Sequence, residues 1–172
     1  MTSSADLLID AFGRIRDVVH AVVDGLTPEQ LAWRVADRAN SMAWLVWHLT
    51  RIQDDHVADA ARIEQVWAAG GWAGRLGLPF DPADTGYGHS SGDVAAVQVR
   101  SGDMLTGYHD AVHDQTIGYV ERLTEGDLDR IVDESWDPPV SLGVRLVSVV
   151  SDALQHAGQA AFVRGVLERR PK

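Results

Sequence analysis

Apolar residues recur at every third or fourth position in four long segments of the chain, which is the spacing of one face of an α-helix. The segments cover residues 5–23, 42 to about 67, 93 or 103 to 123, and 141–169. The start of the third segment is left between two positions because glycines interrupt it. The inward positions predicted for the first three segments are Leu8, Phe12, Ile15, Val19 and Val22, then Trp44, Leu45, Leu49, Ile52 and Val57, then Leu105, Tyr108, Val112, Tyr119 and Val120.

Capping residues support these boundaries. Ser41 is placed to cap the second segment. Before it, Thr27 with Pro28 and Gln30 predicts one short capped helical turn. A similar Leu-Thr turn at 123–128 precedes the fourth segment, so each half of the chain has a helix, a Leu-Thr turn, a loop and a helix with a central histidine. We infer a weak internal repeat of two helical hairpins whose second helices meet near the bundle axis.

No segment shows the alternation of apolar and polar residues that marks a strand, so we expect no sheet. The pattern predicts an all-α fold, a four-helix bundle in one domain that spans residues 1–172. A stretch rich in Gly, Pro and Asp, residues 68–92, makes a long loop between the second and third helices. A loop of that length inside a compact domain favours a functional segment or a lid.

Composition narrows the function classes. The chain has 25 acidic against 15 basic side chains and a formal net charge of −10, which disfavours a nucleic-acid partner or an anionic membrane surface. No segment is apolar enough to span a bilayer, and the N-terminal residues do not resemble a secretory signal, so we expect a cytoplasmic protein that acts on a small molecule. The composition does not decide whether the protein forms a homodimer. Because the chain has no cysteine, a metal ion must be held by His, Asp or Glu, and any thiol must come from outside.

Three side chains form the candidate chemical centre. Asp152 and His156 are one helical turn apart on the same face of the last segment. His48 lies in the apolar stripe of the second segment, so it faces the core. Two histidines and a carboxylate form a known zinc ligand set that leaves coordination positions open. We expect their donor atoms within about 4–5 Å of one another, as metal bonds of roughly 2.0–2.2 Å require. The alternative is a buried hydrogen-bonded pair of Asp152 and His156, with His48 as a core histidine.

Other polar residues are weaker candidates. His89 in the long loop could reach the metal as an acid or an extra ligand, against a solvent-exposed role. Arg145, two turns before Asp152, could bind a substrate carboxylate, against a surface ion pair. His56 is either a substrate contact or structural. The remaining expectations are surface positions for His20, His109 and His113, core positions for Trp44, Trp47 and Trp136, a ligand-orienting role for Gln159, and cationic substrate contacts for Arg51 and Arg164.

Two motifs resemble those of the DinB-like superfamily across nearly the whole chain. The residues from Trp47 to Asp55 resemble its first metal-ligand helix, and His156-Ala157-Gly158-Gln159 resembles its closing H-x-G-Q signature. The resemblance implies a DinB-like four-helix bundle whose metal is held by one histidine on the second helix and a pair on the last. The branch with a glutamate in that pair includes mycothiol-dependent maleylpyruvate isomerase. This chain has the shorter Asp152 there, which bears on the choice of metal.

The resemblance implies a metal-dependent transferase or isomerase that uses a low-molecular-weight thiol, with mycothiol as the cosubstrate. Zinc is the first expectation for the divalent ion, and nickel, iron(II) and manganese are alternatives that the donors also suit. The long loop would close over the electrophile. Two alternatives remain: a hydrolase that uses a metal-activated water, and a non-catalytic bundle that binds a metal or a small molecule.

Overall fold

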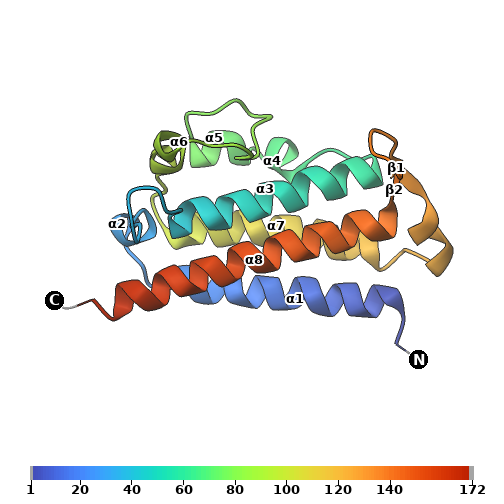
Figure 1. Cartoon of the computed structure of the whole chain (residues 1–172), viewed down its shortest axis with the longest axis horizontal. Coiled ribbons are helices and arrows are strands. Elements are labelled where there is room, and N and C mark those ends of the chain that lie inside the picture. The colour runs from blue at the N-terminus through green and yellow to red at the C-terminus, as the bar shows by residue number, and fades with distance from the viewer. Residues whose placement is uncertain (1, 171–172) are drawn as a thin grey trace.

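A computed structural model of the chain describes residues 2–170 and has the expected four-helix bundle (Figure 1). The long helices are α1 (Ser4–Val23), α3 (Met42–Ala61), α7 (Gly102–Val120) and α8 (Leu142–Glu168). In Figure 1, α8 crosses the front of the bundle between α3 above and α1 below. The prediction of an all-α bundle from helical periodicity is therefore confirmed.

The core lies where the apolar faces of the four helices meet. Phe12 and Ile15 of α1, Leu49 of α3 and Leu105 of α7 are almost completely buried. On α8 the buried positions nearest the candidate centre are small residues, Val149, Ala153, Ala157 and Ala160, which let α3 approach α8 closely. The second and fourth helices therefore pack side by side, as the internal repeat predicts.

Side-chain caps set the helix starts. The Thr27 hydroxyl accepts from Gln30 N and the Gln30 side chain accepts from Thr27 N, which caps α2 (Pro28–Leu31). Ser41 accepts from Trp44 N at the start of α3. Thr124 and Asp127 form the matching capping box of the 3-10 helix η1 (Glu125–Asp129). These caps confirm both predicted Leu-Thr turns.

The segment between α3 and α7 has more helix than we predicted. The second helix ends at Ala61, not near residue 67, because Arg62 takes a left-handed conformation with φ of 56°. Three short helices follow: α4 (Val66–Ala69), α5 (Trp72–Leu76) and α6 (Ser91–Ala96). The longest stretch without regular structure in this segment is therefore residues 77–90.

The expectation of no sheet is wrong. Strands β1 (Ile131–Asp133) and β2 (Val140–Ser141) pair antiparallel just before α8. The expectation that Trp136 is a core residue is also wrong, because this residue lies in the connection between the two strands and is 66% exposed. Two strands of three and two residues are too short to show alternation in the sequence.

Two histidines expected on the surface are buried. His109 is fully buried and His113 is nearly so, both on α7. Thr50 Oγ1 donates to Val46 O at 2.7 Å and lies 3.1 Å from His109 Nδ1, so Nδ1 carries the proton and donates to Thr50. His109 Nε2 is buried without a partner among the described residues. Burial lowers the pKa of His109 to about 3, so the ring is neutral at pH 7.

Among residues 2–170, no helix combines the length and the apolar character that a membrane span requires.

Candidate metal centre

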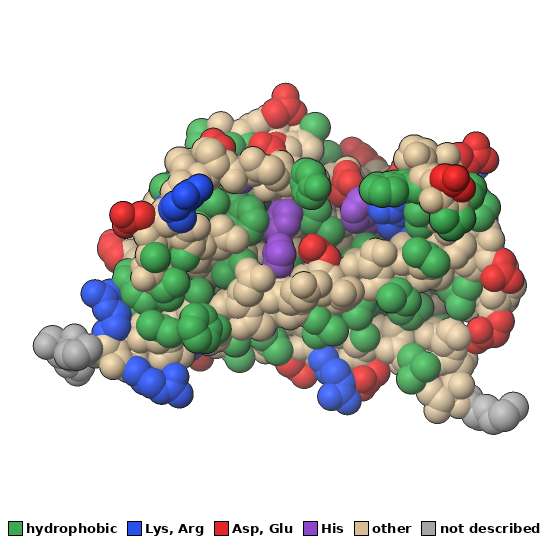
Figure 2. Space-filling view, viewed as in Figure 1, with side chains coloured by type: hydrophobic (Ala, Val, Ile, Leu, Met, Phe, Trp, Pro, Cys, Tyr) green, Lys and Arg blue, Asp and Glu red, His purple; other side chains and the backbone are tan. Residues whose placement is uncertain are grey.

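The close packing of α3 on α8 brings three candidate ligands together. One donor atom from each of His48, Asp152 and His156 lies within 4.8 Å of the other two, inside the range expected from the sequence. Figure 2 shows histidine side chains and a carboxylate exposed in a hollow over the seam between these helices. The site can therefore be reached from outside.

His48 is held in one orientation. Its Nδ1 lies 2.6 Å from Thr85 O, so Nδ1 carries the proton and donates to this carbonyl, which leaves Nε2 without a proton. The ring stacks on Trp44, with centroids 4.5 Å apart and planes at 16°. Burial is the main cause that lowers the pKa of His48. A neutral imidazole with one nitrogen donated to a carbonyl is the form that binds a metal ion.

Asp152 and His156 carry polar atoms that the protein leaves unpaired. Asp152 Oδ2 and His156 Nδ1 are buried and make no hydrogen bond to any described residue. The two side chains form no hydrogen bond or ion pair with each other between residues 2 and 170, so the alternative of a buried Asp152–His156 pair does not describe this structure. Buried polar atoms without partners are costly. A divalent cation would satisfy both, and the donor set suits zinc, iron(II), nickel or manganese.

The loop that carries Thr85, whose carbonyl accepts the hydrogen bond from His48, is held by a network of hydrogen bonds within the protein. Asp84 Oδ1 accepts from Gly86 N at 2.7 Å. His89 Nδ1 accepts from Trp44 Nε1 at 3.1 Å, so Nε2 carries the proton and donates to Asp84 Oδ2 at 2.9 Å. The structure therefore engages both ring nitrogens of His89, and this histidine is not one of the converging donors.

Gly86 brings this loop against the ligand helix. It has a φ of 91°, and a Cβ at this position would lie 2.9 Å from His48 Nδ1 and 2.8 Å from Trp47 Cζ3. Only a residue without a side chain allows this approach. Gly86 thus lets the loop pack directly against His48. The sequence did not indicate this contact because it joins positions 38 residues apart.

Arg51 supports the same loop from the core. Its Nε donates to Asp84 O at 3.2 Å, its Nη1 donates to Gln65 Oε1 at 2.9 Å, and its guanidinium lies 3.7 Å from Asp54. The side chain is completely buried. The expectation that Arg51 contacts an acidic substrate is therefore wrong. Arg164 is likewise engaged, because it donates to the carbonyls of Ala21 and Asp24 at the end of α1.

A cavity of about 220 Å³ opens beside the donors. It is lined by His48, Asp152, Ile52, His56, Tyr87, Ser148 and Val149. His56 makes no hydrogen bond to the described residues, and its Nδ1 lies 3.8 Å from Asp55 Oδ2. Burial, followed by the nearby charge of Arg145, lowers the pKa of His56. We call this space the inner cavity. Besides the candidate ligand His48, His56 is the histidine that lines it.

A second cavity of about 500 Å³ continues outward from the first and shares Ile52, His56 and Tyr87 with it. We call it the outer cavity. Arg145 lines it and donates from Nη2 to Asp133 Oδ2 at 2.6 Å. The structure thus places Arg145 in the wall of the outer cavity, in an ion pair, and outside the lining of the inner cavity.

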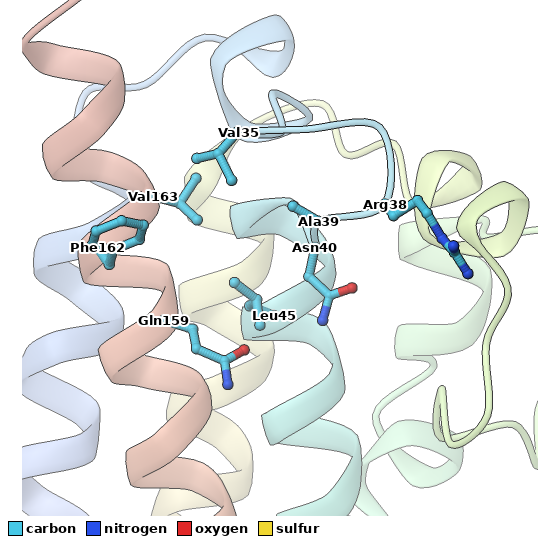
Figure 3. A pocket seen from close by; sticks show the side chains of 8 residues that line it. All are labelled: Val35, Arg38, Ala39, Asn40, Leu45, Gln159, Phe162 and Val163. Atoms are coloured by element: carbon cyan, nitrogen blue, oxygen red, sulfur yellow. The ribbon is translucent and has the colours of Figure 1, made fainter.

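A groove of about 280 Å³ lies on the other side of the donors along the same seam. Its helical residues include Leu45, one turn before His48, and Gln159, one turn after His156. Figure 3 shows Val35, Leu45, Phe162 and Val163 gathered around it, while Arg38 points away. The lining of this groove is mainly apolar. Gln159 is exposed there and makes no side-chain hydrogen bond within the described part of the chain.

Comparisons with known proteins agree with this architecture. A family model described as Mycothiol-S-transferase matches residues 7–169. A solved structure described as the conserved protein of locus from Enterococcus faecalis is similar with a TM-score of 0.90 and 26% sequence identity, over 99% of this chain and 100% of that chain. A comparison with curated proteins finds no match. The resemblance to the DinB-like superfamily is confirmed, since the matched family is a member of it.

Proposed function

Because the chain belongs to the mycothiol-S-transferase family, we propose that it transfers mycothiol to an electrophilic small molecule at a divalent metal ion held by His48, Asp152 and His156. The observation that carries this proposal is the convergence of three donor atoms within 4.8 Å beside an open cavity, with one buried polar atom without a partner on each of the half-buried Asp152 and His156. The absence of cysteine from the chain fits a thiol that arrives as a cosubstrate.

A bound divalent ion supplies positive charge that favours the thiolate form of a thiol, whose ordinary pKa is about 8.5. The protein's own residues do the remaining work. The Thr85 carbonyl holds His48 in the tautomer that presents Nε2. The inner cavity admits the thiol beside the donors, and Ile52, Tyr87 and Val149 give it a partly apolar lining.

His56 is the residue that we assign to proton transfer. Its lowered pKa keeps the ring neutral at pH 7, so it can accept a proton. With Nδ1 turned toward Asp55, Nε2 is the nitrogen that takes the thiol proton as the sulfur forms its bond to an electrophilic carbon of the second substrate. The leaving group on that carbon, chloride in the assay below, departs with the electron pair of the bond that breaks. His56 thus lies in the right cavity for a general base, without being one of the candidate ligands.

The test is an assay of thiol loss with purified protein loaded with zinc. Mycothiol and a chloro-dinitrobenzene electrophile would be incubated with the loaded protein, with the chelator-treated protein, and with the Asp152→Ala variant. We expect loss of free thiol to be accelerated by the loaded wild-type protein alone. Equal rates in all three samples would overturn the proposal.

A further inference from the structure

The outer cavity has the size and position of a second substrate subsite. Its volume of about 500 Å³ lies within the range of small-molecule sites. Because it shares three lining residues with the inner cavity, a ligand with its reactive group beside His48 would extend into it. The walls come from α3, from the loop that carries Tyr87, from β1 and its connection to β2, and from Arg145 on α8.

Two exposed aromatic residues line the outer cavity from different segments. Tyr87 is 89% exposed and Trp136 is 66% exposed. Leaving such large apolar rings in water forgoes the stabilisation that burial would give, so their placement at one cavity indicates a ligand that covers them. Aromatic rings with a polar edge suit ligands that have both C–H faces and hydroxyl groups, because one part packs on the ring and the other stays hydrated.

The polar groups of the outer cavity offer both acceptors and donors. The Asp59 carboxylate makes no hydrogen bond to any residue from 2 to 170, and Asp55 uses one oxygen for Gln65 Nε2 at 2.8 Å. Arg145 uses Nη2 for Asp133, whose other oxygen already accepts from Ser135 N and Oγ. Free carboxylate oxygens therefore stand beside free guanidinium N–H groups. Hydroxyl groups match this arrangement because each can donate and accept.

The charge of the wall excludes an anionic ligand part. Three carboxylates, Asp55, Asp59 and Asp133, face one guanidinium, that of Arg145. This excess of negative charge repels an added phosphate or carboxylate group. A neutral polyhydroxylated ring is the chemistry that fits aromatic rings, open acceptors and this excess of negative charge.

We propose that the outer cavity binds the sugar part of the thiol cosubstrate. Mycothiol carries its cysteinyl group on glucosamine joined to inositol, so a thiol in the inner cavity would extend its two hydroxylated rings toward Trp136 and Tyr87. The inference rests on the proposed function and adds to it a subsite for the sugar part of the thiol cosubstrate. The groove around Phe162 is mainly apolar and has no carboxylate in its lining.

The experiment measures sugar binding apart from catalysis. Glucosaminylinositol, which lacks the thiol, would be titrated into the zinc-loaded protein and followed by ligand-observed NMR and calorimetry. We expect binding to weaken by roughly 3- to 10-fold in Trp136→Ala, the range of one aromatic contact. Phe162→Ala is the matched control, because Phe162 is 65% exposed but lies in the other groove, and its affinity for the sugar should stay that of wild type.

A second readout separates this inference from the proposed function. With activity measured, Trp136→Ala should raise KM for mycothiol by the same factor and leave kcat/KM for N-acetylcysteine within about twofold. Mycothiol turnover with no glucosaminylinositol binding and an unchanged KM in Trp136→Ala would overturn the subsite while the transferase stands. Sugar binding that depends on Trp136, without any mycothiol turnover, would support the subsite and overturn the proposed function.

Discussion

At the scale of residues, the three donors differ in what holds them. His48 is oriented by a carbonyl and a stacked indole, whereas Asp152 and His156 present atoms with no partner among the described residues. The sequence could predict that these three side chains converge, because helical spacing and the family motifs place them. It could not predict that His89 engages Trp44 and Asp84, because these contacts depend on how the loop folds back on α3.

Asp152 should contribute its charge to metal binding. We expect Asp152→Asn to weaken zinc affinity by at least about tenfold, because an amide oxygen lacks the negative charge of a carboxylate. Even the loss of a residue that only hydrogen-bonds to a metal ligand lowers metal affinity by roughly 10–100-fold. Asp152→His should bind zinc more tightly than Asp152→Asn, since an imidazole nitrogen is a zinc ligand that can reach from the same helical turn. Competition titration with a chromophoric chelator measures both. Wild-type affinity in Asp152→Asn would show that Asp152 is not a ligand.

His56 should affect the reaction without affecting the metal. We expect His56→Gln to lower kcat for thiol transfer by about 100-fold, the usual contribution of a general base. Its zinc content should equal that of wild type, because His56 is not among the converging donors. The lowered pKa of His56 further predicts that the wild-type rate rises with pH below 6.5 and that the variant loses this rise. Stopped assays from pH 5 to 8 test this, and an unchanged kcat would contradict the role.

At the scale of elements, caps and periodicity were sufficient for the four long helices. Thr27, Ser41 and Thr124 all cap as predicted, because an N-cap acts on backbone within three residues. The β1–β2 hairpin and the early end of α3 could not be predicted, since two- and three-residue strands carry no period and the left-handed Arg62 has no glycine to mark it. Strands too short to show a period, and a left-handed turn without glycine, therefore could not be predicted from the sequence.

The loop that holds His48 gives a prediction at this scale. We expect Gly86→Ala to weaken zinc affinity by about tenfold or more, because the new Cβ would press on His48 Nδ1 and Trp47 and displace the Thr85 carbonyl. Gly88→Ala is the matched control, since Gly88 also has a positive φ, 77°, but nothing lies within 4 Å of its Cβ position. Chelator competition compares the two. Equal affinities would show that the loop does not position His48.

At the scale of the whole molecule, buried histidines on α7 link stability to pH. His109 was predicted on the surface, although it lies four residues after Leu105 and next to Tyr108, within the buried stripe of α7. Its pKa is about 3 in the folded protein and about 6.5 in the unfolded chain. As the pH falls from 6.5 toward 3, protons bind to the unfolded chain alone, so this histidine makes the fold less stable across that window.

We therefore expect the free energy of unfolding to fall by on the order of 3 kcal/mol between pH 7 and pH 4 on account of His109. The lowered pKa of His113 adds to the loss with the same sign. Urea titrations at several pH values should show a shallower pH dependence in His109→Gln than in wild type. The same slope in both proteins would show that His109 is not the source of the acid sensitivity.

The measurement that tests the metal centre most directly is the metal content of the purified protein, determined by elemental analysis beside circular dichroism. We expect close to one divalent ion per wild-type chain. We expect none in His156→Ala, with helix content retained because the bundle has its own core. Wild-type protein that binds no ion after incubation with zinc, iron(II), nickel or manganese, or a folded His156→Ala that keeps its ion, would contradict the assignment of His48, Asp152 and His156 as the ligands.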